Sequence, residues 1–308
     1  MRLSILLVGA IGLGWAPLSA RAQETVFTAE TGPLPGLVDD ATRLDQASAE
    51  ARFDALIGLL EARGLSYEVQ TFPNRRAAES GPAQGRNVSV VIGTGDEEIV
   101  VGAHADAAQL GDGSFSHAMV DNAAAVAVLV RIAATLPRFA VRHRVRVVFF
   151  DLEELNLLGS EYMVTTLDAD RVAAMINLDI AGYGDTVIYG PAAGPGNGAV
   201  YRAVAQACAD GGHPCLEFDQ FPQSDDRSFQ AAGIPNVSLG ILTSVEAHQL
   251  WLMLNGGPNS GLAERFVPPI LRTIHTQADT ADRLDPEGMT LAYNILMALI
   301  LKLDRPTP

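Results

Sequence analysis

Histidines and acids suited to holding a metal ion recur along this 308-residue sequence. Five of them form the candidate set: His104, Asp121, Glu154, Asp179 and His275. Two imidazoles and three carboxylates make a borderline-hard set of nitrogen and oxygen donors, for which zinc is the natural partner. Taken alone, each has an ordinary structural explanation, such as a helix cap, a turn acid or a surface histidine. Their number and order favour a single metal site built from all five.

Two further acids stand beside these residues and suggest catalytic roles. Asp106 follows His104 by two positions, where a carboxylate can orient a metal-binding imidazole. Glu153 directly precedes Glu154, and both follow an apolar run that ends in Phe150. Two adjacent glutamates at the edge of a core are costly unless a cation compensates their charge. One would bind the metal and leave its neighbour free to act on the attacking water.

The candidate residues are expected where strands end or helices begin. Strands are predicted at residues 67–72, 87–92, 98–103, 142–151, 174–180, 186–189 and 235–241. Helices are predicted at residues 48–63, 122–136, 159–167, 198–210, near 224 and at 286–303. The alternation predicts one α/β domain with a mixed, largely parallel central sheet flanked by helices. Ligand sites in such sheets collect at the carboxyl ends of the strands.

Composition limits the classes of partner. Hydrophobic residues make up 48% and charged residues 19% of the chain, which excludes disorder. The formal net charge of -15 argues against nucleic acid or anionic lipid as partner, because both need basic patches. No segment after the N-terminal region is expected to be apolar enough to cross a membrane. Peptides and metal ions remain compatible with this surface.

The N-terminus has the features of a secretory signal. Arg2 precedes a short apolar stretch at residues 5–15, and Ala20-Arg21-Ala22 offers a cleavage site. We therefore expect a signal peptide at residues 1–22, a catalytic domain at 23–308, and a periplasmic or secreted protein. A retained anchor is the weaker alternative. In an oxidising compartment Cys208 and Cys215, which flank a Gly- and Pro-containing turn, are expected to form a disulfide rather than two free thiols.

The motifs around the candidate residues resemble those of the bacterial di-zinc aminopeptidases, whose relatives include glutamate carboxypeptidases and glutaminyl cyclases. The shared motifs are Gly-Ala-His-x-Asp, Asp-Asn-Ala, Asp-x-Glu-Glu-x-x-x-x-Gly-Ser, Asn-Leu-Asp-x-x-Gly and His-Thr-x-x-Asp-Thr. They match in order and spacing from about residue 66 to residue 303. The resemblance implies a zinc-exopeptidase, phosphorylase/hydrolase-like fold and two zinc ions per chain.

The resemblance also implies a role for each residue. Asp121 would bridge the two zinc ions, with His104 and Asp179 completing one site. Glu154 and His275 would complete the other site. Glu153 would be the general base and Asp106 the partner of His104. A cis peptide between Asp121 and Asn122 is expected as well.

Several positions depart from the family pattern. Asp226 stands where many relatives carry the histidine of Ser-Asp-His-x-x-Phe, and Phe221 lies near the position of a tyrosine that donates to the oxyanion in some aminopeptidases. His117 and His248 are alternative donors. The residue that stabilises the oxyanion therefore stays open.

The leading interpretation is an aminopeptidase that removes N-terminal residues from peptides with a free N-terminus. A mono-zinc glutaminyl cyclase is an alternative, although cyclases usually carry Ser where this chain has Asn122. A carboxypeptidase would need a basic pocket, for which Arg227 is the nearby candidate. A catalytically silent zinc-binding module is disfavoured because the base and all ligands are present. Residues 243–266 are expected to form a long loop, either a lid with Trp251 and Met253 facing substrate or a packing or oligomer contact.

Overall fold

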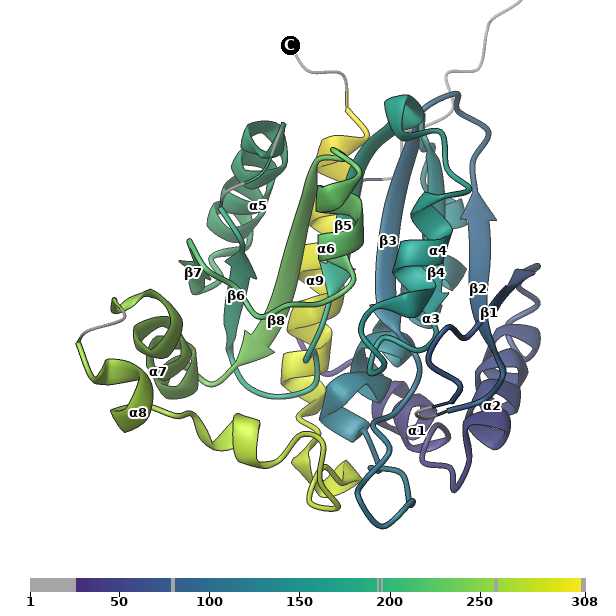
Figure 1. Ribbon diagram of the computed structural model, residues 1–308. Coiled ribbons are helices and arrows are strands. Elements are labelled where there is room, and N and C mark those ends of the chain that lie inside the picture. The colour runs from purple at the N-terminus through teal and green to yellow at the C-terminus, as the bar shows by residue number, and fades with distance from the viewer. Residues whose placement is uncertain (1–25, 79–80, 193, 195, 258–259, 306–308) are drawn as a thin grey trace, which may run out of the picture.

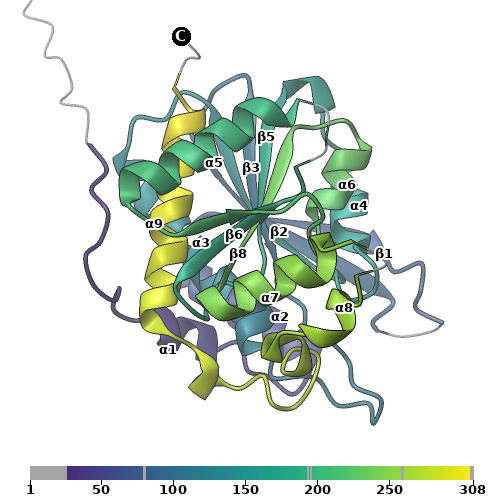
Figure 2. The ribbon, with the colours of Figure 1, turned by 90° about the vertical axis from the view of Figure 1, so that its left-hand side faces the viewer.

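The computed structural model describes residues 26–78, 81–192, 194, 196–257 and 260–305. Within these residues an eight-stranded twisted sheet runs through the molecule, with helices on both of its faces (Figure 1 and Figure 2). The predicted signal peptide, residues 1–22, lies outside the described residues. The predicted α/β architecture with a central sheet is confirmed.

The sheet is mixed, as predicted. Its strands, in spatial order, are β1 (Glu68–Pro73), β2 (Gln84–Ile92), β4 (Arg144–Phe150), β3 (Glu98–His104), β5 (Val172–Leu178), β8 (Asn236–Leu242), β6 (Thr186–Gly190) and β7 (Cys215–Glu217). The central strands β4, β3, β5 and β8 pair in parallel. Antiparallel pairing joins β1 to β2, β2 to β4 and β6 to β8. The four parallel strands therefore end at the same edge of the sheet.

Helices cover the two faces unequally. One face carries α3 (Ala124–Thr135), α5 (Asn197–Gly211), α9 (Pro286–Leu303) and the short α1 (Leu37–Thr42) (Figure 2). The other face carries α4 (Leu158–Val164) and α6 (Asp226–Ala231). At the β2 side, α2 (Ala49–Glu61) contacts the sheet through Arg86, which lies over the ring of Phe53. Short 3-10 turns occur at Leu136–Arg138, Ala169–Arg171, Pro269–Arg272 and Ala281–Arg283.

Helix α3 forms the centre of the larger core. Its alanine- and valine-rich sequence leaves small side chains all round, so it lies buried between the sheet and its neighbours α1 and α9. The stretch Met119–Arg138 is long and apolar enough to cross a membrane, with a mean hydropathy of 1.6, but 83% of that window is buried inside the protein. The expectation that no later segment would be so apolar was wrong. Burial in a protein core produces the same composition as burial in lipid.

The segment at residues 243–266 is largely helical, so the predicted long loop is wrong. It forms α7 (Ser244–Asn255) and α8 (Leu262–Arg265) beyond the ends of β6 and β8 (Figure 1). Thr243 caps α7 by accepting a hydrogen bond from the backbone N–H of Glu246, in the Thr-x-x-Glu pattern of a capping box. The ring N–H of Trp251 donates to the carbonyl oxygen of Glu217 in β7. This side chain is therefore fixed against the edge of the sheet.

Smaller differences concern short elements. Strand β7 and helix α1 were not predicted, because three and six residues carry too little periodicity to be recognised. The predicted disulfide is confirmed: Cys208 and Cys215 are bonded at 2.03 Å and join the end of α5 to β7.

Candidate metal centre

The five predicted ligands converge at the carboxyl edge of the parallel strands. His104 ends β3, Glu154 follows β4, and Asp179 follows β5. Asp121 lies in the irregular turn Met119–Ala123 before α3, and His275 lies in the loop before α9. Their donor atoms form groups within 4.8 Å of one another: His104, Asp121 and Asp179 in one, and Asp121, Glu154 and His275 in another. Residues separated by up to 171 positions, from 104 to 275, therefore meet in one cluster.

Asp121 is shared between the two groups. Its Oδ1 lies 3.0 Å from His104 Nε2, and its Oδ2 lies 3.1 Å from His275 Nε2. Beyond the histidines, Asp179 Oδ1 is 3.7 Å from His104 Nε2 and Glu154 Oε2 is 3.1 Å from His275 Nε2. Tetrahedral zinc with ligand bonds of about 2.0–2.2 Å separates its donors by roughly 3.4 Å. The donor spacings of both groups fit such an ion.

Asp106 connects the histidine to the glutamates. Its Oδ1 lies 3.5 Å from His104 Nδ1, on the side of the ring opposite Asp121. Its carboxylate also accepts hydrogen bonds from the backbone N–H groups of Glu153, at 3.1 Å, and Glu154, at 3.2 Å. One buried carboxylate therefore orients the His104 ring and the turn that carries both glutamates.

Asn122 holds the Asp121 turn against the end of β5. Its side-chain amide donates to the carbonyl oxygen of Leu178 at 3.0 Å and accepts from the N–H of Ile180 at 3.2 Å. These two bonds bracket Asp179 and place it beside Asp121. The expected cis peptide between Asp121 and Asn122 is present.

Two residues that support the centre had no role assigned from the sequence. Asp279 is fully buried and accepts hydrogen bonds from the N–H groups of Val120, at 2.8 Å, and Asp121, at 3.1 Å. Its place in the His-Thr-x-x-Asp-Thr motif was the available signal. Arg52 in α2 donates to the carbonyl oxygens of Ala105 and Ala118, which lie next to ligand-bearing turns. Nothing in an amphipathic helix marks one arginine as buried, so this role was not predictable.

The backbone around the ligands adopts left-handed conformations at non-glycine residues. Positive φ angles occur at Ala118 (51°), Leu152 (59°), Ile180 (63°) and His275 (56°). Each such residue costs on the order of 1–3 kcal/mol and persists only where its surroundings hold it. All four lie within three residues of a candidate ligand or are one. This clustering is typical of a functional site rather than of a surface turn.

The charges of the cluster are unbalanced without a cation. Burial raises the pKa of Glu154 and of Glu153, the latter well above its usual range even though the His104 charge opposes it. Burial lowers the pKa of His104, but the surrounding acids, Glu153 first, outweigh it and leave the pKa well above its usual value. Hydrogen bonds to Asp121 and Glu154 raise the pKa of His275 to about 11. The carboxylates around both histidines therefore favour positive charge in this cluster, which is the charge that a metal ion supplies.

Buried carboxylate oxygens without hydrogen-bond partners also indicate that the cluster is built to bind a cation. Among the described residues, the buried atoms Asp179 Oδ1 and Glu154 Oε1 have no hydrogen-bond partner. An unpaired buried carboxylate oxygen is expensive, and coordination to a cation removes the cost. The donor types and the spacing together fit zinc.

The positions that depart from the family pattern lie close to the Asp179 side. Ser224 Oγ accepts a hydrogen bond from Asn177 near the end of β5, which places the following Asp225 and Asp226 beside Asp179. Both acids are fully buried, and their carboxylate oxygens lack hydrogen-bond partners among the described residues. Burial raises the pKa of Asp225 to about 7 and that of Asp226 to about 8.

The alternative oxyanion donors are paired elsewhere. His117 Nδ1 lies 2.8 Å from Asp45, and His248 Nδ1 lies 2.7 Å from the carbonyl oxygen of Ser244 in its own helix. Phe221 is buried and has no hydroxyl group to donate. The structure therefore does not favour any of the three for this role.

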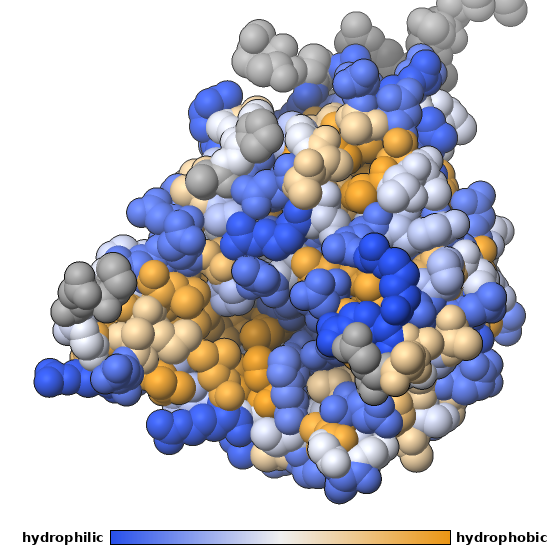
Figure 3. Space-filling model, viewed as in Figure 1, coloured by the Kyte–Doolittle hydropathy of each residue, from blue (hydrophilic) through white to orange (hydrophobic). Residues whose placement is uncertain are grey.

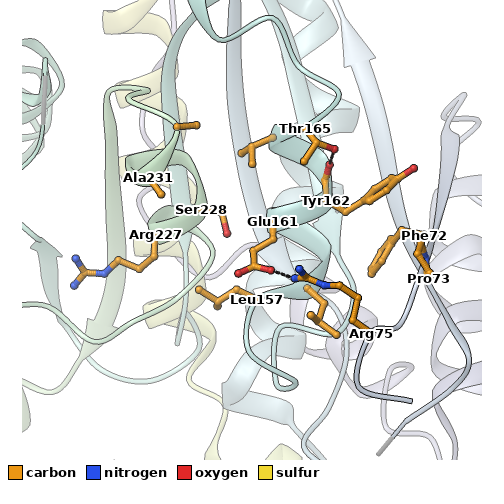
Figure 4. A pocket seen from close by; sticks show the side chains of 13 residues that line it. Phe72, Pro73, Arg75, Leu157, Glu161, Tyr162, Thr165, Arg227, Ser228 and Ala231 are labelled. Carbon is orange, nitrogen blue, oxygen red and sulfur yellow. Dashed lines mark hydrogen bonds and ion pairs between the residues drawn. The ribbon is translucent and has the colours of Figure 1, made fainter. Parts of the chain in front are cut away.

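Arg227, the candidate for binding a substrate carboxylate, is also engaged. It donates to the carbonyl oxygen of Phe221 and to the side chain of Gln230. It borders a cavity of about 590 Å³ between α4 and α6, and its guanidinium points away from the Arg75–Glu161 ion pair on the other side (Figure 4). The residues that line this cavity include none of the five candidate ligands.

The molecular surface is hollowed at the ligand edge of the sheet. Figure 3 shows a depression near the ends of the central strands, with apolar side chains gathered on the side formed by α7 and α8. A polar cluster at the floor of an apolar hollow is the usual form of a small-molecule or peptide site.

An α/β sheet with two overlapping groups of zinc-type donors at its carboxyl edge defines a metal-dependent hydrolase site. A family model described as Peptidase family M28 matches residues 87–300, which is more than half of the chain. The chain therefore belongs to peptidase family M28.

Similar proteins include both enzyme types considered above. The "Probable lipoprotein aminopeptidase LpqL" of Mycobacterium tuberculosis is 27% identical over 256 residues, which cover 75% of this chain and 48% of the relative. An aminopeptidase structure from Aneurinibacillus sp. strain AM-1 superposes with a TM-score of 0.57 at 22% identity, covering 73% of this chain and 49% of that one. The glutaminyl cyclase of Porphyromonas gingivalis has a TM-score of 0.62 at 19% identity, covering 86% of this chain and 93% of its own. The chain spans about half the length of both aminopeptidases, and the two structural likenesses concern the fold alone.

Proposed function

We propose that this protein is a zinc-dependent aminopeptidase that removes N-terminal residues from peptides. Two zinc ions per chain would be held by His104, Asp121, Glu154, Asp179 and His275. The observation that carries the proposal is the position of Asp121, whose two carboxylate oxygens face His104 and His275 at 3.0 and 3.1 Å. A site for a single metal ion would need only one of these two oxygen–histidine pairs.

The bound ions would polarise the scissile carbonyl and lower the pKa of the attacking water. Glu153, which is not among the proposed metal ligands, would carry the proton from the water to the leaving amine. Its carboxylate can approach donor atoms of His104 and Glu154 within 4.8 Å, and burial raises its pKa well above the usual range. A glutamate with a raised pKa can accept a proton from water and then pass it to the leaving amine near neutral pH. Asp106 acts as a positioning residue for both steps.

The substrate must present a free ammonium group, and the site supplies the charge to receive it. Asp225 and Asp226 lie behind Asp179, and their carboxylate oxygens accept no hydrogen bond from the described residues, with Arg227 Nε 3.9 Å from Asp226 Oδ2. The gathering of three carboxyl groups at this point favours an N-terminal ammonium near Asp179. It disfavours a C-terminal carboxylate, because Arg227 donates to Phe221 and Gln230 and its charge is already paired with Asp226.

We also propose that the protein is exported and that its signal peptide is removed. Residues 1–22 would be removed as a signal peptide, and residues 23–308 would form the catalytic domain of a periplasmic or secreted enzyme. The name of the Mycobacterium tuberculosis relative, a lipoprotein aminopeptidase, supports export. The helical segment α7–α8 borders the surface hollow and is proposed as one wall of the pocket for the N-terminal side chain.

The test combines zinc content with cleavage of aminoacyl-p-nitroanilides, N-blocked peptides and N-terminal glutaminyl peptides. We expect about two zinc ions per chain and cleavage of the free-amine substrates alone. Glu153→Gln should keep its zinc and lose about 10²–10⁴-fold in kcat, as expected for a general base. Glu161→Gln in α4, a glutamate paired with Arg75 at the surface, is the matched control and should retain its rate.

Other outcomes would select a different function. One zinc per chain with cyclisation of glutaminyl peptides would replace the aminopeptidase with a cyclase. Zinc binding without turnover of any substrate would indicate a catalytically silent module. Full activity of Glu153→Gln would remove this residue from the role of base.

A further inference from the structure

A second hollow adjoins the candidate metal centre on the side away from Asp179. It has a volume of about 350 Å³ and is bordered by Glu154 and His275. Apart from the polar Asp106 and Gln109, its other lining side chains are apolar and include Pro82, Ala108, Leu110, Phe115, Leu152 and Leu155. The volume is at the lower end of the roughly 300–1,000 Å³ found for ligand pockets, so it suits one or two residues of a peptide.

The outer wall of this cavity is a structured loop. Residues 107–116 fold back on themselves through a bridge between Gln109 and Phe115 and a hydrogen bond from the N–H of Ser116 to the carbonyl oxygen of Ala108. The Gln277 side chain donates to the carbonyl oxygen of Phe115 at 3.0 Å. The loop is therefore tied to the segment that carries His275. Leu110 and Phe115 keep a fixed place relative to the metal centre.

The charges of the site set the direction in which a peptide lies. Three carboxyl groups, those of Asp179, Asp225 and Asp226, lie together on one side of the centre, and the buried Asp179 Oδ1 has no hydrogen-bond partner among the described residues, so the substrate ammonium is drawn to that side. In a peptide, the ammonium and the leaving nitrogen lie on opposite sides of the scissile carbonyl. The leaving nitrogen must then face Glu154 and His275, where the apolar cavity begins.

We infer that this cavity binds the side chain of the residue that follows the scissile bond, and that it prefers an apolar one. The inference rests on the proposed aminopeptidase function. We call the cavity the leaving-residue pocket. It adds a second specificity determinant to an enzyme of this type, because cleavage would depend on the second residue of the peptide as well as on the first.

The test uses dipeptides that share the first residue preferred in the p-nitroanilide panel and differ in the second. Glycine, leucine, phenylalanine and glutamate are placed second, and the aminoacyl amide, which lacks a second residue, is the reference. We expect kcat/KM for leucine or phenylalanine to exceed that for glycine by about tenfold or more, as is typical for filling an apolar pocket. Glutamate should be the poorest, because the site is acidic.

Leu110→Arg tests the pocket wall directly. It should reduce kcat/KM for second-position phenylalanine by about tenfold relative to the aminoacyl amide, and raise the same ratio for glutamate. Val69→Arg, at an exposed position of β1, is the matched control and should leave all rates as they are. Because Leu110 is partly exposed and its loop bonds are made by the backbone, the variant is expected to fold.

The outcomes separate this inference from the proposed function. If free-amine peptides are cleaved but the second residue has no effect, the pocket assignment is wrong and the aminopeptidase stands. If Leu110→Arg instead changes the preference for the first residue, the peptide lies in the opposite direction. If no free-amine peptide is cleaved, the proposed function itself fails.

Discussion

The two halves of the candidate metal centre differ in their access to solvent. In the half formed by His104 and Asp179, the side chains are 1% and 18% exposed. In the half formed by His275 and Glu154, the values are 54% and 11%. Asp121 belongs to both, and its side chain is 6% exposed. One half is thus enclosed by the sheet and the other opens to the surface.

The origin of this difference lies in the elements that carry the ligands. His104 ends a fully buried strand and has Asp106 behind its ring. His275 lies in a loop, with a left-handed backbone. A ligand that ends a rigid strand and has a carboxylate against the far side of its ring is pre-oriented, whereas a ligand in a loop must be ordered for binding. The enclosed half is therefore suited to retaining its metal, and the open half to admitting substrate and releasing product.

The largest expected effect is the difference in zinc content between the variants His104→Ala and His275→Ala. His104→Ala should abolish activity and lose the zinc ion proposed for the enclosed half. His275→Ala should keep about one zinc per chain. In the unmodified protein, zinc transfer to a chelator should occur in two phases whose rates differ by about tenfold or more, because an outer partner such as Asp106 is worth about 10–100-fold. Release of both zinc ions at one rate would contradict the proposed difference between the enclosed half and the open half.

A smaller effect is expected at the carboxylate behind the enclosed half. Asp106→Asn should weaken zinc binding by about 10–100-fold, because the amide orients the His104 ring and the Glu153 turn less well than a carboxylate does. Competition with a zinc-binding dye measures the change. Asp112→Asn, at an exposed position of the neighbouring loop, is the control and should bind zinc normally. Unchanged zinc affinity in Asp106→Asn would mean that this carboxylate does not orient the ligands.

The smallest effect concerns the buried acid beside the enclosed half. Burial raises the pKa of Asp226 to about 8, above its value in the unfolded chain, so the folded state binds the proton more tightly. Stability should therefore fall as pH rises from about 4 to about 8, and the penalty should be complete above that range. Asp226→Asn should gain little over the unmodified protein at pH 4, where the penalty has barely begun, and should exceed it by about 2 °C or more in Tm at pH 9.

Thermal unfolding of the metal-free protein at the two pH values measures this effect, because no cation then offsets the carboxylate. Asp54→Asn in α2 is an exposed control and should show no pH-dependent difference. An equal gain at both pH values would mean that the amide improves packing and that the charge of Asp226 is not the cause.

Much of the fold followed from local patterns. The long buried helix α9 was predicted at its observed bounds, and the strands ending in His104 and Leu178 were predicted within two residues. These elements have strong periodicity and clear boundaries. The segment around α7 was missed because four consecutive apolar residues, Trp251 to Leu254, obscure a helical period. The Thr243 cap was the better signal.

The sequence by itself determined the donor types, their order and their places at strand ends. The disulfide was also predictable from the sequence, since Cys208 and Cys215 are only seven positions apart and flank a turn. Only the tertiary structure decided that Asp121 stands between His104 and His275, that Asp279 and Arg52 hold the ligand turns, and that one half of the centre is buried. Strand ends are local properties of the chain. The contacts among them depend on which strands become neighbours in the sheet, and burial depends on every element packed around that edge.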